Sequence, residues 1–380
     1  MILSSQYGFV RARQLEGSFP GDPAIGVWGT SSNRIVYGWG TIPEDAWPRA
    51  RPFSSPEPDG LDELAKRHRL GRYQRIRDSN ECRVILAYDA ATIPELNRRK
   101  RSGVSPLLGA YLCLEITQSF IDARRGMIGR PPTGSPILGS HSVVIIKDQK
   151  PQKRFEFWNS WGTSWGDDGH GSIPYSVFDE FMIEAWAADA IVHPEYHVVK
   201  EPERAWEEPD PLGTLLFGME VNCVEQNERM GWAFACLRDE FLDIEELFVR
   251  PQYRRRGIGD QLVEMLKQTA RKLRKPMRAW VPFVDCYQSN RDNLSAILKK
   301  LELSPRKSGV PWAGYVAHPG KFRSFDPIRI PPVPAHARNA ALTSPPGPVV
   351  DEEAAAEAEL DRWAAIVKRA RLSRAREDQD

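Results

Sequence analysis

Three arginines and two glycines stand immediately before a predicted helix, in the segment 249–262 that reads VRPQYRRRGIGDQL. An apolar run precedes this segment, so we expect it to join a strand to a helix. Gly257 and Gly259 allow a tight turn in which successive N–H groups converge on one point. The helix dipole and Arg254–Arg256 add positive potential there. The pattern predicts a pyrophosphate-binding loop, and a plain turn with a solvated basic edge is the alternative.

The helix that follows this loop is expected over residues 258–273. Its apolar residues recur at a spacing of about 3.6, which places them on one face, and such a stripe usually packs against a core. They are Ile258, Leu262, Met265, Leu266, Ala270 and Leu273. The same half of the chain predicts strands at 213–224, 230–237, 242–249, 277–284 and 312–317 and a second helix at 293–301.

This order of strands, loop and helices over residues 213–318 resembles the GNAT family of N-acetyltransferases. In that family a (Q/R)xxGx(G/A) loop binds the pyrophosphate of acetyl-CoA, and the preceding strand runs beside the pantetheine. The resemblance therefore implies acetyl-CoA as the cofactor that donates the acyl group. The implied cofactor-binding residues are Leu247, Val249, Arg254, Arg255, Arg256, Gly257, Ile258, Gly259 and Asp260.

An N-acetyltransferase also needs a base for the ammonium proton of its acceptor. In the GNAT family this base is often a Glu on the strand before the loop, and Glu245 and Glu246 are the candidates. Because neighbours on a strand alternate in direction, one of them is expected to face away. A carboxylate that merely pairs with the arginines is the alternative for either. The family's proton-donating Tyr aligns with Leu298, which leaves the general acid unassigned, with Tyr287 a poor substitute.

A second pattern lies in residues 155–175, FEFWNSWGTSWGDDGHGSIPY, where three Trp alternate with glycines. His141 precedes the apolar strand expected at 142–146, and Asn159 follows it by 159 − 141 = 18 positions. This arrangement resembles the carboxy-terminal lobe of papain-like cysteine peptidases. In that family the Asn orients the imidazole, and the Trp that matches Trp161 shields their hydrogen bond. The resemblance covers about residues 1–190 and makes His141 and Asn159 catalytic residues of a peptidase or its remnant.

A cysteine peptidase also needs a thiolate at the start of a helix. No Cys here opens a Gly-rich helix start; the five are Cys82, Cys113, Cys223, Cys236 and Cys286. Residues 3–7 (LSSQY) and 40–48 (GTIPEDAWP) resemble segments that in the family come after the Cys helix. We therefore expect an incomplete first lobe, either because the true start lies upstream or because the domain has lost its nucleophile.

The chain as a whole predicts an α+β protein in several parts. A truncated papain-like domain is expected over 1–195 and a GNAT domain with a mixed sheet over 213–320, joined by a charged, Pro-rich linker at 196–212. A second Pro-rich linker (321–350) and a charged helical tail (351–380) follow. Within the first domain we expect a helix at 59–70 that Gly71 caps, and strands at 82–90 and 108–119.

Composition narrows the function further. A formal net charge of +1 argues against a globally basic nucleic-acid binder, and no Cys/His cluster has the spacing of a zinc site. No leader pattern opens the chain, and no apolar run approaches the roughly 20 residues that cross a bilayer. A cytoplasmic protein without a membrane partner or a metal is expected, while the oligomeric state is left open.

Three functions are compatible with these patterns. The first is an acyl-CoA-dependent N-acyltransferase for an amine of a peptide, a protein or a small molecule, with the papain-like part presenting the substrate. The second is a working cysteine peptidase fused to an acetyltransferase, which requires a nucleophile encoded upstream. The third is a non-catalytic regulator that binds CoA and peptide. We rank them in this order.

Overall fold

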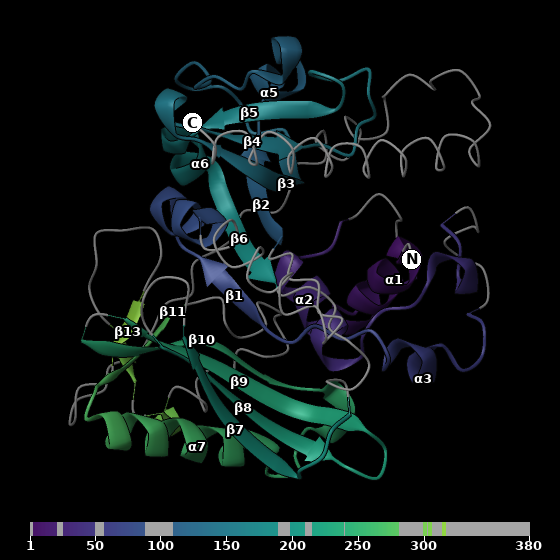
Figure 1. The fold of residues 1–380 in the computed structure, drawn as a ribbon, viewed down its shortest axis with the longest axis vertical. Coiled ribbons are helices and arrows are strands. Elements are labelled where there is room, and N and C mark those ends of the chain that lie inside the picture. Colours follow the sequence, from purple (N-terminus) through teal and green to yellow (C-terminus); the bar gives the residue numbers. More distant parts are fainter. Residues whose placement is uncertain are drawn as a thin grey trace, which may run out of the picture. The chain divides into compact units, whose positions relative to one another are not determined.

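The computed structural model describes residues 3–20, 26–49, 57–87, 109–188, 198–209, 215–238, 240–280, 299–301, 303–305 and 314–316. They form two β-sheets with helices packed against them, so the predicted α+β class is confirmed (Figure 1). The predicted second linker and tail, the predicted helix up to residue 298, and Tyr287 and Leu298 lie outside the described residues.

The first sheet has six strands in the order β1-β6-β2-β3-β4-β5. All its neighbouring strands are antiparallel, and one face carries a core rich in aliphatic and Phe side chains. The strands predicted around residues 108–119 and 142–146 are both in this sheet. Its strands are β1 (Tyr73–Ile76), β2 (Gly109–Ile116), β3 (Gly139–Gln149), β4 (Arg154–Trp158), β5 (His170–Pro174) and β6 (Met182–Ala188), with the short helices α5 (Gln118–Ile121) and α6 (Tyr175–Phe181) beside them.

The helices α1 (Ser5–Leu15), α2 (Gly29–Gly38) and α3 (Leu61–Ala65) form a small second core in this half. Ser4 caps α1, because its Oγ accepts a bond from the Tyr7 N–H at 3.2 Å and donates one to the Trp47 carbonyl at 2.6 Å. The two family-like segments at 3–7 and 40–48 therefore touch each other in the fold.

The second sheet has seven strands in the order β12-β13-β11-β10-β9-β8-β7. Only β10 and β11 run parallel, so the predicted mixed sheet is confirmed. The turn that joins β8 to β9 comprises residues 224–227. The strands are β7 (Glu203–Pro209), β8 (Leu215–Cys223), β9 (Glu228–Arg238), β10 (Phe241–Val249), β11 (Met277–Trp280), β12 (Ser304–Pro305) and β13 (Gly314–Val316).

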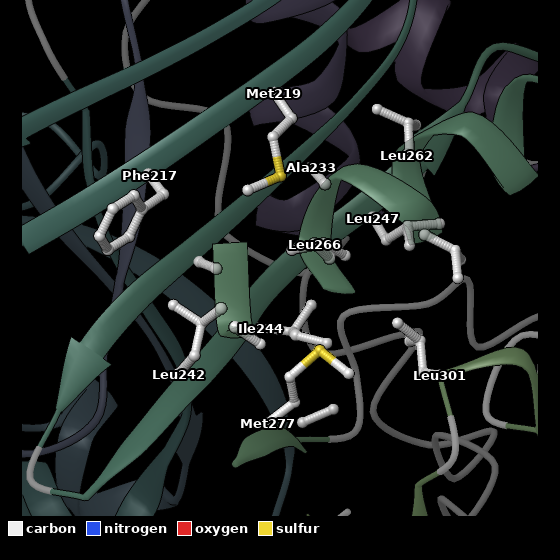
Figure 2. Close-up of a cluster of buried hydrophobic side chains, with 14 of the residues drawn as sticks. Phe217, Met219, Ala233, Leu242, Ile244, Leu247, Leu262, Leu266, Met277 and Leu301 are labelled. Carbon is white, nitrogen blue, oxygen red and sulfur yellow. The ribbon is translucent and has the colours of Figure 1, made fainter. Parts of the chain in front are cut away.

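One face of this sheet is covered by α7 (Ile258–Leu273), whose bounds match the prediction (Figure 1). Figure 2 shows its Leu262 and Leu266 among side chains from β8 to β11. The predicted apolar stripe faces this core, with Met265 and Leu273 partly buried at its margin. Gly231 permits the close approach, since a Cβ there would lie 2.8 Å from Cγ2 of Ile258.

The opposite face of the second sheet packs against residues of the first half. Tyr37 of α2 and Tyr73 of β1 lie among Trp232, Phe234 and Phe248 of β9 and β10. The ring of Tyr37 is 5.1 Å from those of both Trp232 and Phe234, measured between centroids. The two sheets therefore share one aromatic core.

The strand predicted at 82–90 is wrong, because residues 79–87 are helical. The helix begins after Asp78, whose Oδ1 accepts a hydrogen bond from the Glu81 N–H at 2.8 Å. Glu81 in turn accepts a bond from the Arg77 N–H, also at 2.8 Å. Asp78-Ser79-Asn80-Glu81 is thus close to a capping-box signature, and this local signal outweighs the β-branched and aliphatic run that follows.

Two further boundaries differ from the prediction. The helix predicted at 59–70 ends at Ala65 with Lys66, and not Gly71, as its C-cap. Beyond it the buried Arg69 bonds the carbonyls of Trp39 and Asn227. The predicted linker 196–212 contains the strand β7, which pairs with β8 along its whole length. Trp206 anchors this charged edge strand, because its ring packs directly on Gly218 of β8. A Cβ on Gly218 would lie 2.0 Å from that ring.

Candidate functional site

The loop between β10 and α7 has the backbone that a phosphate cradle requires. Arg255 has a φ of 63° and Gly257 a φ of 80°, so two left-handed residues turn the chain into the helix. Gly257 is the N-cap of α7, and a Cβ added there would meet no atom within 4 Å. There is therefore room at the start of the helix, where by helix geometry the N–H groups of Ile258 and Gly259 lack partners within the helix. The Asp260 N–H already donates to the Gly257 carbonyl at 3.0 Å.

The side chains around this loop make it positive. Arg254 fastens the loop to the strand before it, since its Nε donates to the Val249 carbonyl at 3.1 Å. Arg256 lies 5.5 Å from the centre of the Tyr253 ring. Asp260, the acidic residue in the first turn of the helix, forms an ion pair with Lys300. Because Lys300 balances this carboxylate, the three arginines set the sign of the local potential.

Among the described residues, the parallel pairing of strand β10 ends before this loop. It pairs with β11 only over residues 242–244, and its register with β9 shifts between Ile244 and Glu246. The Arg250 N–H bonds the Met230 carbonyl of β9 at 2.9 Å, so the alternation of the ladder turns the backbone groups of Leu247 and Val249 toward the opposite edge. Among the described residues no strand pairs with that edge beyond Ile244.

The open edge contains the backbone groups predicted to lie beside pantetheine. The Leu247 N–H donates to Oε1 of Glu246 at 3.1 Å, and the Val249 carbonyl accepts from Arg254. The Leu247 carbonyl and the Val249 N–H point the same way. The structure thus places the predicted edge and the predicted loop next to each other at the two ends of one segment.

The two candidate bases face the same direction, which corrects the expectation that one turns away. The register shift is a β-bulge at Glu245, and the extra residue breaks the alternation of the strand. Glu246 is fully buried and accepts two bonds from Arg34, Nη2 to Oε1 at 2.8 Å and Nε to Oε2 at 3.1 Å. Glu245 is also buried and lies 3.0 Å from Nη2 of Arg77.

Both carboxylates are therefore enclosed in ion pairs with residues of the first half. The bonds described for them come from Arg34 and Arg77, whereas the alternative prediction supposes Arg254–Arg256. Sequence patterns miss these partners because Arg34 is 212 positions from Glu246, and an Arg within a short helix is usually a surface residue. Glu246 also accepts a hydrogen bond from the Tyr73 hydroxyl, and Glu245 also pairs with Arg238 of β9.

The first half brings His141 and Asn159 together through the pairing of β3 with β4. Nε2 of His141 lies 2.7 Å from Oδ1 of Asn159, and because an amide oxygen only accepts, Nε2 donates. The Trp161 ring covers the pair, 4.5 Å from the imidazole between centroids. Asn159 is buried, and its Nδ2 has no hydrogen-bond partner among the described residues.

The cysteines within the described residues do not complete this pair. Cys82, Cys113 and Cys236 are buried, and Cys223 is half-buried at the end of β8. Burial, with the Glu184 carboxylate nearby, raises the pKa of Cys113 to about 12, and burial also raises the pKa of Cys82. These two residues are therefore thiols at neutral pH.

The pKa of His141 gives a test of this site. Burial lowers it below the ordinary value of 6.5, and the hydrogen bond to Asn159 opposes the shift in part. The unfolded chain takes up a proton as the pH falls through about 6.5, while the folded ring resists it, so this residue costs stability at low pH. We expect the free-energy difference between wild type and His141→Gln to fall as the pH is lowered from about 7.5 to about 5. An NMR titration of the ring with a midpoint at or above 6.5 would contradict this.

The two geometries define two classes of domain on one chain: a sheet with a papain-like His–Asn pair, and a mixed sheet with a glycine loop at a helix start. Residues 172–296 match the model of the acetyltransferase (GNAT) family, so the chain contains a GNAT-family domain. The matched range extends back into β5, before the first strand of the second sheet.

The first half is similar to papain-like peptidases. An uncharacterised peptidase C1-like protein of Acanthamoeba polyphaga mimivirus is 27% identical over 104 residues, which are 27% of this chain and 33% of that protein. The match thus spans a third of the relative's length. Xylellain, a cysteine protease from Xylella fastidiosa, has a TM-score of 0.42 at 18% identity, covering 50% of this chain and 70% of that structure.

Solved structures also match the second half. The PaiA N-acetyltransferase of Thermoplasma acidophilum, in complex with coenzyme A, has a TM-score of 0.22 at 13% identity, covering 27% of this chain and 59% of that structure. Within the described residues, no helix is both long and apolar enough to cross a membrane.

Proposed function

We propose that this protein is an acyl-CoA-dependent N-acyltransferase, and specifically an N-acetyltransferase acting on an amine of a peptide, a protein or a small molecule. The observation that carries the proposal is the left-handed Gly257 at the start of α7, where an added Cβ meets no atom within 4 Å and three arginines precede the glycine. Bound acetyl-CoA would supply an activated acyl group for transfer to the amine. The GNAT-family match supports the reaction class.

The residues present fit this cofactor. The amides of residues 255–259 and the side chains of Arg254–Arg256 suit a pyrophosphate, because oriented N–H groups at a helix start bind anions. The edge of β10 at Leu247 and Val249 offers backbone groups to an extended amide chain such as pantetheine. The acceptor amine would approach beyond Ile244, the last residue of β10 that pairs with the described part of β11.

The contacts of Glu245 and Glu246 favour a structural role for both. A general base must reach the proton that it accepts. Each carboxylate is instead turned toward a guanidinium of the first half, at Arg77 and Arg34 respectively. We propose that they hold the bulge of β10 in place, and that the acceptor's proton leaves by another route.

Binding of acetyl-CoA tests the proposal. In Gly257→Glu, the new carboxylate enters the space for the pyrophosphate, and a φ of 80° strains any side chain there. We expect isothermal titration calorimetry to show acetyl-CoA binding to wild type and a loss of at least about 100-fold in affinity for the variant, which also loses amide contacts.

Gly60→Glu is the matched control. Gly60 is the N-cap of α3 with a φ of 75°, and a Cβ there also meets nothing within 4 Å. The control variant therefore places the same strain and the same charge at a helix start, but at one that no run of arginines precedes. Equal losses in both variants, or no binding to wild type, would overturn the proposal.

The pairing of His141 with Asn159 at 2.7 Å favours a second candidate, a cysteine peptidase whose nucleophile comes from a segment outside this sequence. We propose that the described part of this half does not cleave peptides by itself, because its cysteines are enclosed. It would instead present a peptide or protein amine. An in-frame Cys-bearing helix start in the DNA upstream of Met1 would support the second candidate, and a stop codon there would remove it.

A further inference from the structure

Arg34 is a buried cation that joins the two sheets. Its side chain is 2% exposed and bonds both oxygens of the Glu246 carboxylate. The guanidinium also lies over the Phe248 ring, 4.7 Å from its centre. A fork of two parallel N–H donors together with a stacked plane fixes both the position and the orientation of its partner.

The carboxylate that Arg34 holds lies at the bulge of the edge proposed for the acyl donor. Oε2 of Glu246 also accepts from the Tyr73 hydroxyl at 3.0 Å, and Oε1 accepts from the Leu247 N–H at 3.1 Å. Leu247 is the first residue after the bulge whose backbone groups point to the open edge. A shift of the Glu246 carboxylate would therefore directly change the hydrogen bonding of the Leu247 N–H on that edge.

A second contact leads from Arg34 to the loop. The Phe248 ring that lies beneath Arg34 is also 5.9 Å from the guanidinium of Arg254. Arg254 donates to the Val249 carbonyl and begins the cradle. One aromatic ring thus contacts the residue that fixes the bulge and the residue that fixes the loop.

The position of Arg34 is in turn set by the first sheet. Its helix, α2, begins against the buried carboxylate of Glu184 on β6. The Gly29 N–H donates to Oε1 of Glu184 at 2.6 Å, and Oγ1 of Thr30 donates to Oε2 at 2.8 Å. A Cβ on Gly29 would lie 2.4 Å from the Tyr111 hydroxyl, so α2 packs closely against the first sheet at this glycine.

We propose that Arg34 of the peptidase-like half is a positioning residue for the acyl-CoA edge of the acetyltransferase half. Through Glu246 it fixes the bulge of β10, and so it sets the direction of the Leu247 N–H and the position of the strand end from which the loop begins. The peptidase-like half then serves the transferase as a structural part of its donor site. The effect of Arg34 on acetyl-CoA binding rests on the proposed function. The effect of Arg34 on the position of β10 does not.

Arg34→Lys tests the proposal, because lysine keeps the charge but loses the fork and the stacking plane. We expect hydrogen–deuterium exchange to become about tenfold faster for the amides of residues 245–249 in the protein without ligand, and the Kd for acetyl-CoA to rise about tenfold. Arg83→Lys is the matched control: Arg83 pairs with Asp148 at 3.4 Å and lies over the Tyr175 ring at 5.1 Å, all within the first half.

The outcomes separate positioning from stability. If Arg34→Lys lowers the melting temperature but leaves exchange at 245–249 and the Kd as in wild type, Arg34 is merely structural and the proposal fails. If the variant does not fold, Arg34→Met combined with Glu246→Leu removes both charges, and faster exchange at 245–249 relative to α7 is then the expected result. If wild type does not bind acetyl-CoA, the proposed function falls, and the exchange measurement still decides the role of Arg34.

Discussion

Replacing Asp243 with Asn is expected to lower the free energy of unfolding by about 3–5 kcal/mol, the range for breaking a buried ion pair from one side. Asp243 is fully buried on β10. Its carboxylate accepts from Nη2 of Arg77 at 2.6 Å and from Nε and Nη2 of Arg278 at 2.5 and 2.7 Å. The amide keeps the volume but removes the negative charge that faces two partly buried guanidinium groups, and Glu245 still pairs with Arg77. Urea denaturation followed by circular dichroism measures the loss.

Asp260→Asn is the matched control for this substitution. Asp260 also pairs with a cation, Lys300, but more than half of each side chain is exposed. Water replaces the partner at such a site, so exposed pairs contribute little to stability. If Asp243→Asn cost no more than Asp260→Asn, the network between the halves would be as weak as a surface ion pair.

The parts of the fold that the sequence predicts well are those whose signals are local. The apolar stripe of α7 and the loop before it are both encoded in one stretch of 25 residues, 249–273. Both lie where the apolar spacing and the glycines predict them. His141 and Asn159 meet because a single antiparallel pairing joins two strands that are close in the chain. A periodic pattern needs no knowledge of distant partners.

The parts that the sequence does not reveal depend on distant contacts. Two neighbouring Glu on an apolar strand suggest one buried and one exposed side chain, since only the alternation is visible. The bulge at Glu245, Arg34 of α2 and Arg77, which follows β1, turn both carboxylates inward. The two carboxylates meet their arginine partners only in the folded protein. In the sequence alone, such charged residues look like those of a solvent-exposed surface or of an active site. The helix at 79–87 is a different case, because its capping signal is present in the sequence and the apolar run obscures it.

Replacing Trp232 with Ala is expected to destabilise both halves together, by about 3–5 kcal/mol. Trp232 is fully buried, and its ring lies 5.1 Å from Tyr37 and 4.9 Å from Phe248. Its Nε1 donates to the Tyr73 hydroxyl at 2.9 Å, so the substitution also removes a donor from a buried polar group. Gly38 leaves the space for this ring, since a Cβ there would lie 2.5 Å from it. Truncation thus opens a cavity lined by residues of both sheets.

The measurement is differential scanning calorimetry combined with hydrogen exchange at β3 and at α7, which report on the two halves separately. We expect one transition in wild type and one in the variant, at a lower temperature, with exchange faster at both elements, because the aromatic core belongs to both sheets. Trp161→Ala is the control: this ring is 36% exposed and covers His141 on the first sheet, so its loss should leave exchange at α7 unchanged. Two separate transitions in wild type, with β3 unaffected by Trp232→Ala, would show that the halves fold independently. A donor edge positioned by Arg34 would then lack a rigid support.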